Sequence, residues 1–356
     1  MDWRVKATVQ AVLAAVPGGV HANELLQRYA GGRAPRHLRW RARLHLSQLR
    51  NCVLPTLRSQ NVSLAGAEVL EIGTGFEPTF AMCLSGLGAR VTTIDVRRSL
   101  KASRYLREFV RRIWQSTGDE LLWSPAQERG IRAFFSGSAS VTELLACLGV
   151  RYLAPVADEV LLDLPPRSFD LVFSISVLPH VRPEGLEAIM RGQRHVLRPS
   201  GLAYHYLGLE DNFALIDHGI TPLNYLRYDG PLWRWLGENE ISYQNRLRKS
   251  DYDRLFAAHD FETLVDQATV DEPTRQLLLS RRLPLAGRFR AYDVDDLATL
   301  QQAVVLTPRP RAAAVGRRRP QRRNRGSPGG GYPGGGCRGG CDGYAGGGVA
   351  KPGGGG

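Results

Sequence analysis

Short apolar runs alternate with segments of helical spacing between residues 66 and 210. The runs cover residues 68–72, 90–95, 150–153, 169–175 and 201–207. Each run is short and is bounded by Gly, Pro or Asp, which is typical of strands buried on both faces of a parallel sheet. Strands that alternate with helices in this way predict an α/β protein. We therefore expect a doubly wound, mostly parallel sheet of the Rossmann type.

The segments on either side of this core have different patterns. Residues 1–60 repeat apolar positions at helical spacing and predict a helical N-terminal extension to a core that spans residues 61–210. Residues 211–307 mix aromatic and charged side chains, with helices expected near 249–258 and 293–304, and we interpret them as an extension of the core beside its site. Residues 308–356 are Gly-rich and Arg-rich, and we expect a disordered tail because they cannot bury enough apolar surface.

Positive charge is concentrated in this tail. The 356 residues carry a formal net charge of +13, of which +9 falls at Arg309 and beyond and only about +4 before it. Arg-Gly segments with interspersed tyrosines can bind RNA through phosphate contacts and stacking. The tail therefore predicts either a solubilising tether or a non-specific RNA contact.

Composition sets limits on location. Five scattered cysteines do not make a disulfide framework, and they fit a reducing compartment. No run of eighteen apolar residues is present, so we expect no membrane span. The sequence also lacks a convincing set of metal ligands. These features predict a cytoplasmic protein without a metal.

A glycine-containing turn follows the first predicted strand. This strand ends in Gly73-Thr74-Gly75, and the next strand ends in Asp95. In a doubly wound sheet the carboxyl ends of these strands border the ligand crevice. Gly73 and Gly75 allow the backbone to approach a ligand, and Asp95 can accept hydrogen bonds from ribose hydroxyls.

The residues around this turn favour one nucleoside cofactor over another. A dinucleotide site expects a third glycine, but Phe76, Glu77 and Pro78 follow Gly75. Glu71 and Glu77 place negative charge beside the turn, which disfavours a diphosphate. The same charge suits the sulfonium and ammonium groups of S-adenosylmethionine.

The succession of motifs resembles class I S-adenosylmethionine-dependent methyltransferases. The resemblance rests on residues 71–75 with Asp95, then on 168–174 and 194–201, and covers about residues 65–210. It implies a class I methyltransferase fold and S-adenosylmethionine as the cofactor. Two departures leave the acceptor side open: Glu77 or Pro78 replaces a third glycine, and Pro179-His180 stands where the family commonly has Glu-His.

The resemblance also implies the cofactor-binding residues. Glu71, Gly73 and Gly75 would line the methionine end, and Asp95 would bind the ribose. Asp158 would contact the adenine amine, with Asp163 as a competing candidate.

A hydroxyl acceptor would need a base to take its proton. We rank His205 and Asp211 first, because both lie at or just after the last predicted strand of the core, and we keep His180 as a third candidate. His205 could instead point into the sheet, and His180 could cap the following helix.

Residues 220–228 resemble a pattern of some polysaccharide-associated and natural-product methyltransferases. This second resemblance supports O-methylation of a small-molecule or glycan acceptor. Two alternatives remain open. One is an RNA methyltransferase that holds its substrate with the tail, and the other is a cofactor-binding fold that serves only as an interaction module.

Overall fold

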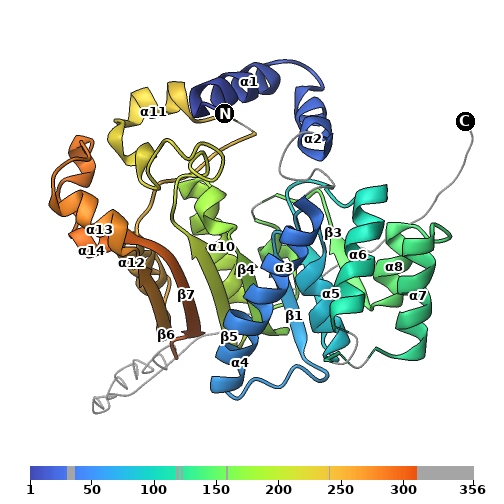
Figure 1. Cartoon of the computed structure of the whole chain (residues 1–356). Helices are drawn as coiled ribbons and strands as arrows, with labels where there is room; N and C mark the ends of the chain where they lie inside the picture. Colours follow the sequence, from blue (N-terminus) through green and yellow to red (C-terminus); the bar gives the residue numbers. More distant parts are fainter. Residues whose placement is uncertain (30–36, 118–119, 122, 158, 240, 311–356) are drawn as a thin grey trace, which may run out of the picture. The chain divides into compact units, whose positions relative to one another are not determined.

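The computed structural model describes residues 1–29, 37–117, 120–121, 123–157, 159–239 and 241–310 (Figure 1). Asp158, proposed above for the adenine, lies outside the described residues. Residues 311–356 lie outside them too, so the prediction of a disordered or RNA-binding tail stays a prediction.

One seven-stranded sheet forms the centre of the described chain. Its strands are β1 (Glu68–Ile72), β2 (Arg90–Ile94), β3 (Val150–Leu153), β4 (Phe169–Ile175), β5 (Leu197–Gly208), β6 (Phe261–Val270) and β7 (Thr299–Pro308). Their spatial order is β3-β2-β1-β4-β5-β7-β6. Strands β1 to β5 pair in parallel, and β7 runs antiparallel to both β5 and β6. The predicted doubly wound, mostly parallel α/β fold is therefore confirmed.

The order of the strands locates the crevice. The chain proceeds from β1 outward to β2 and β3, and then returns to place β4 on the other side of β1. The carboxyl ends of β1 and β4 thus diverge at a topological switch point, where open α/β sheets bind ligands.

Helices cover both faces of the sheet because successive strand residues point to opposite sides. Val69 and Phe173 pack in a cluster with side chains of α5 (Thr79–Gly86), α6 (Arg104–Thr117), α7 (Pro125–Ser136) and α8 (Val141–Cys147). Leu70 and Val172 face the other way and pack against α10 (Pro183–Val196) and α12 (Lys249–Ala258), on the face that also carries α9 (Val160–Asp163). This burial on two faces explains the near-continuous apolar strands.

The N-terminal 60 residues form helices that pack in two different places. They comprise α1 (Trp3–Ala15), α2 (Gly19–Tyr29), α3 (Leu38–Gln48), a π-helical turn (Leu49–Val53) and α4 (Leu54–Ser59). Leu46 and Val53 join the cluster beneath α5 and α6. Trp3 instead packs against Phe213 and Trp233, and its backbone N–H donates to Asp217 at 2.9 Å. Helix α1 is thereby joined to the segment after β5.

The chain after β5 completes the sheet. It contains a 3-10 turn (Asn224–Arg227), α11 (Gly230–Leu236), α12, β6, α13 (Glu272–Leu279), a second 3-10 turn (Gly287–Phe289), α14 (Val294–Ala298) and β7. The helix expected near 249–258 is confirmed as α12, but the one expected near 293–304 is confirmed only in its first part, as α14. Helix α14 ends at Ala298, and Val304 and Val305 lie in β7, where β-branched side chains are buried on both faces between β5 and β6.

No helix in the described ranges has the length and apolar character that crossing a bilayer requires. The cytoplasmic location stays a prediction.

Candidate functional site

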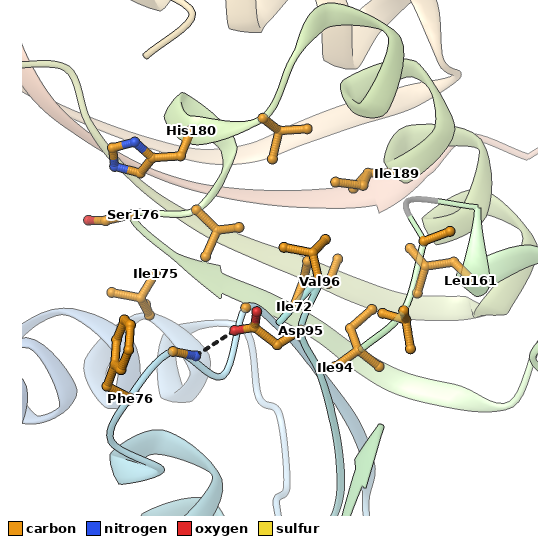
Figure 2. Close-up of a pocket in the computed structure, with 16 residues that line it drawn as sticks. Ile72, Phe76, Ile94, Asp95, Val96, Leu161, Ile175, Ser176, His180 and Ile189 are labelled. Atoms are coloured by element: carbon orange, nitrogen blue, oxygen red, sulfur yellow. Dashed lines mark hydrogen bonds between the residues drawn. The ribbon is translucent and has the colours of Figure 1, made fainter. Parts of the chain in front are cut away.

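A cavity of about 430 Å³ opens at the carboxyl ends of β1, β2 and β4 (Figure 2). This volume is in the range of sites that hold small molecules. The residues that line it come from the loops after four strands and from α9 and α10, and they include Gly73, Gly75, Phe76, Asp95, Val96, Val156, Ala157, Leu161, Ser176, Val177, His180 and Ile189. The cavity therefore occupies the crevice that the sequence predicted.

Asp95 lies at the centre of this cavity, directly after β2. Its Oδ2 accepts a hydrogen bond from the Gly75 backbone N–H at 2.8 Å, and its Oδ1 accepts one from the Arg97 N–H at 2.9 Å. Each carboxylate oxygen keeps a further lone pair. Burial raises the pKa of Asp95, while the two backbone hydrogen bonds oppose that rise. Both oxygens can therefore accept hydrogen bonds from a ligand in the cavity.

The turn after β1 requires glycine for two reasons. Gly73 and Gly75 have φ angles of +83° and +66°, in the left-handed region that disfavours other residues. A Cβ added to Gly73 would also lie 2.4 Å from Cγ2 of Val177. The loops after β1 and β4 are thus in direct contact beneath the cavity.

Glu71 is near the cavity but is not among the residues that line it. Its side chain is buried, and its Oε2 accepts a hydrogen bond of 2.5 Å from Thr93, whose hydroxyl also contacts that of Thr74 at 2.5 Å. Burial raises the pKa of Glu71 to about 8. At neutral pH the side chain is therefore mainly uncharged, and it braces the turn from below.

Glu77 is likewise turned away from the cavity. Arg41 donates to its two carboxylate oxygens at 3.0 and 2.9 Å, and the Tyr105 hydroxyl donates at 2.9 Å. The sequence argument placed the negative charge of Glu71 and Glu77 beside the turn, but neither carboxyl lines the cavity. Glu71 is buried with a raised pKa, and Glu77 is balanced by a guanidinium from α3. The carboxylate that faces the cavity is Asp95, and no lysine or arginine is among the described residues that line it.

The far end of the cavity is apolar. Val156, Ala157, Leu161 and Ile189 form it, next to the position of Asp158, which lies outside the described residues. The competing candidate Asp163 is exposed at the end of α9 and does not line the cavity. The described surface suits a planar, weakly polar ring.

Ser176 is a lining residue that the sequence argument missed. It follows β4 with a φ of +55°, which is unfavourable for a residue with a side chain, and its N–H donates to the Tyr206 carbonyl at 2.8 Å. Strained residues of this kind cluster at functional sites. The available signal was its position, since it is the first residue after a strand that ends at the crevice.

His180 lies at the other end of the cavity, beside Ser176 (Figure 2). Its Nδ1 is 2.7 Å from the carbonyl oxygen of Tyr243. A carbonyl can only accept, so Nδ1 carries the proton and Nε2 keeps a lone pair. Nε2 accepts a long hydrogen bond, of 3.5 Å, from the side-chain amide of Asn212. The tautomer of His180 therefore leaves Nε2 able to accept a proton.

His205, ranked first from the sequence, does not reach the cavity. It lies fully buried in β5, where Nδ1 is 2.8 Å from the Ser174 hydroxyl and Nε2 is 3.1 Å from Oε1 of Gln193. Burial lowers the pKa of His205 to about 3. Both ring nitrogens are used in the core, so the structure places this histidine in a packing role.

Asp211 is also buried and does not line the cavity. Its oxygens accept from the Phe213 N–H at 2.8 Å and from the Asn224 amide at 3.2 Å, and burial raises its pKa to about 6. The Tyr225 hydroxyl donates to the Leu209 carbonyl at 2.7 Å. Asn224 and Tyr225 belong to the 220–228 pattern. Their side-chain hydrogen bonds to Asp211 and Leu209 therefore hold the loop after β5 in place.

Within the described ranges, no three or more His, Cys, Asp or Glu side chains are grouped so that they could hold a metal ion.

Comparison with known proteins finds no matching family profile and no matching curated sequence. Solved structures of similar fold include a methyltransferase from Methanosarcina mazei described as S-adenosylmethionine-dependent, with 17% identity and a TM-score of 0.38, covering 72% of this chain and 97% of that one. Another is the magnesium protoporphyrin IX methyltransferase of Synechocystis PCC 6803, with 11% identity and a TM-score of 0.42, covering 84% and 99%. A third, from Mesorhizobium loti, has 16% identity and a TM-score of 0.37, covering 71% and 96%.

Proposed function

We propose that this protein is an S-adenosylmethionine-dependent methyltransferase that methylates a hydroxyl oxygen of a small-molecule or glycan acceptor. The observation that carries the proposal is the Asp95 carboxylate. It is fixed by the Gly75 and Arg97 N–H groups and faces a cavity whose described lining has no basic side chain.

This arrangement discriminates between nucleoside cofactors. A diphosphate would meet an acidic group and no described cation in the cavity, whereas Arg, Lys and free backbone N–H groups are the usual partners of phosphate. A nucleoside that bears a positive sulfur gains from a carboxylate. The ribose hydroxyls would bind the two oxygens of Asp95, and the adenine would lie against Val156, Ala157 and Leu161.

The turn after β1 would hold the methionine part, with Gly73 and Gly75 in contact with it. Glu71 would act indirectly, by bracing this turn through Thr93 and Thr74.

His180 is the base that the geometry supports. Bound S-adenosylmethionine would supply the methyl group to the acceptor oxygen and keep the carbon–sulfur electron pair on sulfur, and Nε2 of His180 would take the proton of the acceptor hydroxyl. The Tyr243 carbonyl holds the ring in the tautomer that this transfer requires. Alignment of the acceptor in the cavity would supply most of the acceleration.

Calorimetry with S-adenosylmethionine and with NAD⁺ tests the cofactor. We expect binding of the first and none of the second, and the reverse result would refute the proposal. A methyl-labelled donor incubated with cell-extract fractions tests the acceptor. Label in low-molecular-weight or glycan fractions is the expected result, and label in RNA would favour the RNA methyltransferase alternative.

A further inference from the structure

Residues 242–248 contact His180, which lines the cavity, through the Tyr243 carbonyl. The Tyr243 carbonyl accepts from His180, and the Asn245 amide donates to the carbonyls of Leu178 and Val181 at 2.8 and 3.1 Å. The Gln244 amide donates to the Glu210 carbonyl at 2.8 Å. The segment is therefore fixed to the loops that follow β4 and β5, and groups attached to it have defined positions relative to His180.

Three arginines belong to this segment or contact it: Arg246 lies within it, the Arg182 guanidinium stacks on Tyr243, and Arg288 donates to the Arg246 carbonyl. We call them the arginine cluster. Their charges and that of Arg234 lower the pKa of one half-buried carboxyl, Glu238, against the rise that burial causes. The Arg182 guanidinium lies 4.5 Å from the centre of the Tyr243 ring.

The position of Arg182 connects the arginine cluster to the cavity. It directly follows Val181, which lines the cavity, and it is the N-cap residue of α10. Only Val181 separates His180 from Arg182 in the chain. Tyr243 also connects them, because its carbonyl accepts from His180 and its ring stacks on the Arg182 guanidinium.

Arg246 shows that the positive charge in this cluster is costly. Its side chain is only 4% exposed, and Nη1 donates to the carbonyls of Tyr225 and Tyr228 at 3.0 and 2.7 Å. Burial and the neighbouring charge of Arg288 lower the pKa of Arg246 to about 10. Arg288 is also tied to it, because its Nη2 donates to the Arg246 carbonyl at 3.3 Å. The Arg246 guanidinium also lies 5.5 Å from the centres of the Trp233 and Phe289 rings, and an anion bound beside it would further favour its charged form.

The described residues do not neutralise this charge by contact. All ion pairs between described residues involve other side chains. Of the described carboxyls, Glu238 and Glu184 place negative charge near Tyr243, against the three guanidinium groups of the arginine cluster and that of Arg234.

We propose that the arginine cluster binds an anionic group, a carboxylate or a phosphate, carried by the acceptor, and thereby orients its hydroxyl toward His180. This proposal rests on the proposed function, because the anion is assigned to the methyl acceptor. Guanidinium groups suit either anion, since their planar N–H pairs match two of its oxygens. The acceptor class is then a hydroxylated acid or a phosphorylated small molecule or sugar.

Titration of the 356-residue protein with inorganic phosphate at low ionic strength tests whether the arginine cluster binds an anion. We compare wild type with R182Q/R288Q, which removes two exposed members of the arginine cluster, and with R39Q/R43Q, which removes two exposed arginines of α3. We expect at least about tenfold weaker phosphate binding in R182Q/R288Q and no change in R39Q/R43Q. The variant E238Q removes the opposing acid and should bind phosphate more tightly, a gain that misfolding could not produce.

Titration of the same proteins with S-adenosylmethionine separates the two proposals. Absence of donor binding to the wild type would count against the proposed function alone. Normal donor binding with no phosphate binding to the wild type, or with equal phosphate affinity in all variants, would overturn the arginine-cluster proposal. As a second readout, extract is passed over an anion exchanger before labelling with methyl donor. We expect the acceptor in the retained fraction, and an acceptor confined to the flow-through would also overturn the proposal.

Discussion

The carboxylate of Asp95 accepts a hydrogen bond from the backbone N–H of Gly75 at 2.8 Å, across the adjacent ends of β2 and β1 (Figure 2). This contact joins the two sequence motifs that predicted the site. It fixes the carboxylate at the cavity while leaving lone pairs for a ligand. It also holds the turn in the conformation that only its glycines adopt without strain.

Asp95 should dominate donor affinity. Removing the carboxylate in D95A deletes two charge-assisted hydrogen bonds, each worth about 1.5–3 kcal/mol. We expect the Kd for S-adenosylmethionine to rise by at least about tenfold, measured by calorimetry. D229N, which changes an exposed aspartate at the start of α11, is the matched control and should bind normally. Equal affinity in D95A and wild type would contradict the ribose assignment.

His180 should control turnover and leave donor binding unchanged. We expect H180A to lower kcat by about 10²–10⁴-fold, because it removes the proton acceptor. The wild-type rate should rise with pH as the imidazole loses its proton, and H180A should lack this rise. The control H218A removes an exposed histidine outside the cavity. A steady-state pH profile with the identified acceptor makes the measurement, and an H180A profile like that of wild type would exclude this base.

His205 should contribute to stability and take no part in turnover. H205A leaves the Ser174 hydroxyl and the Gln193 amide without their buried partner. We expect the free energy of unfolding to fall by about 2 kcal/mol or more, since each unsatisfied buried group costs about 1–3 kcal/mol. Urea unfolding measures this loss. The opposite pattern, with stability retained and kcat lost, would restore His205 as the base.

Glu71 should make stability depend on pH. Its pKa is about 8 when folded, above the ordinary value of 4.5, so between these values the folded state holds a proton that the unfolded state releases. Its contribution to stability is therefore fully present below pH 4.5 and is lost as pH rises through 8. E71Q has no carboxyl to titrate at this position. Between pH 5 and pH 8.5 the unfolding free energy of wild type should therefore fall relative to that of E71Q. A gap that does not change with pH would show that Glu71 is ionised throughout.

Gly73 should tolerate alanine less well than another glycine of similar backbone conformation. G73A and G66A both place a Cβ at positive φ, but only the first brings it within 3 Å of another atom, on Val177. Both variants bear a backbone cost of about 1–2 kcal/mol. We expect G73A to lose about 1 kcal/mol or more beyond G66A, from overpacking, and to bind the donor more weakly. Equal losses by thermal unfolding would show that the two loops separate easily.

Several features of the site followed from local pattern. The strands β1 to β5 could be predicted because burial on both faces leaves short apolar runs between helical segments. Gly73, Gly75 and Asp95 could be assigned because the carboxyl ends of neighbouring parallel strands meet at one edge of the sheet. The antiparallel β7 was missed, since a short apolar run beside a helix does not reveal its type by periodicity alone.

The sequence by itself determined strands β1 to β5, the crevice, and Gly73, Gly75 and Asp95 beside it, because these depend on spacing along the chain. Only the tertiary structure decided the charge state of the site and which candidate bases reach the cavity. Glu77 is balanced by Arg41 and Glu71 is neutralised by burial, and neither effect can be read from neighbours in sequence. His180 lines the cavity and residue 243, sixty-three positions away, sets its tautomer, while Ser174 and Gln193 occupy both nitrogens of buried His205. The ionisation and hydrogen bonding of a side chain depend on its tertiary contacts and on its desolvation, and both of these are fixed only when the chain folds.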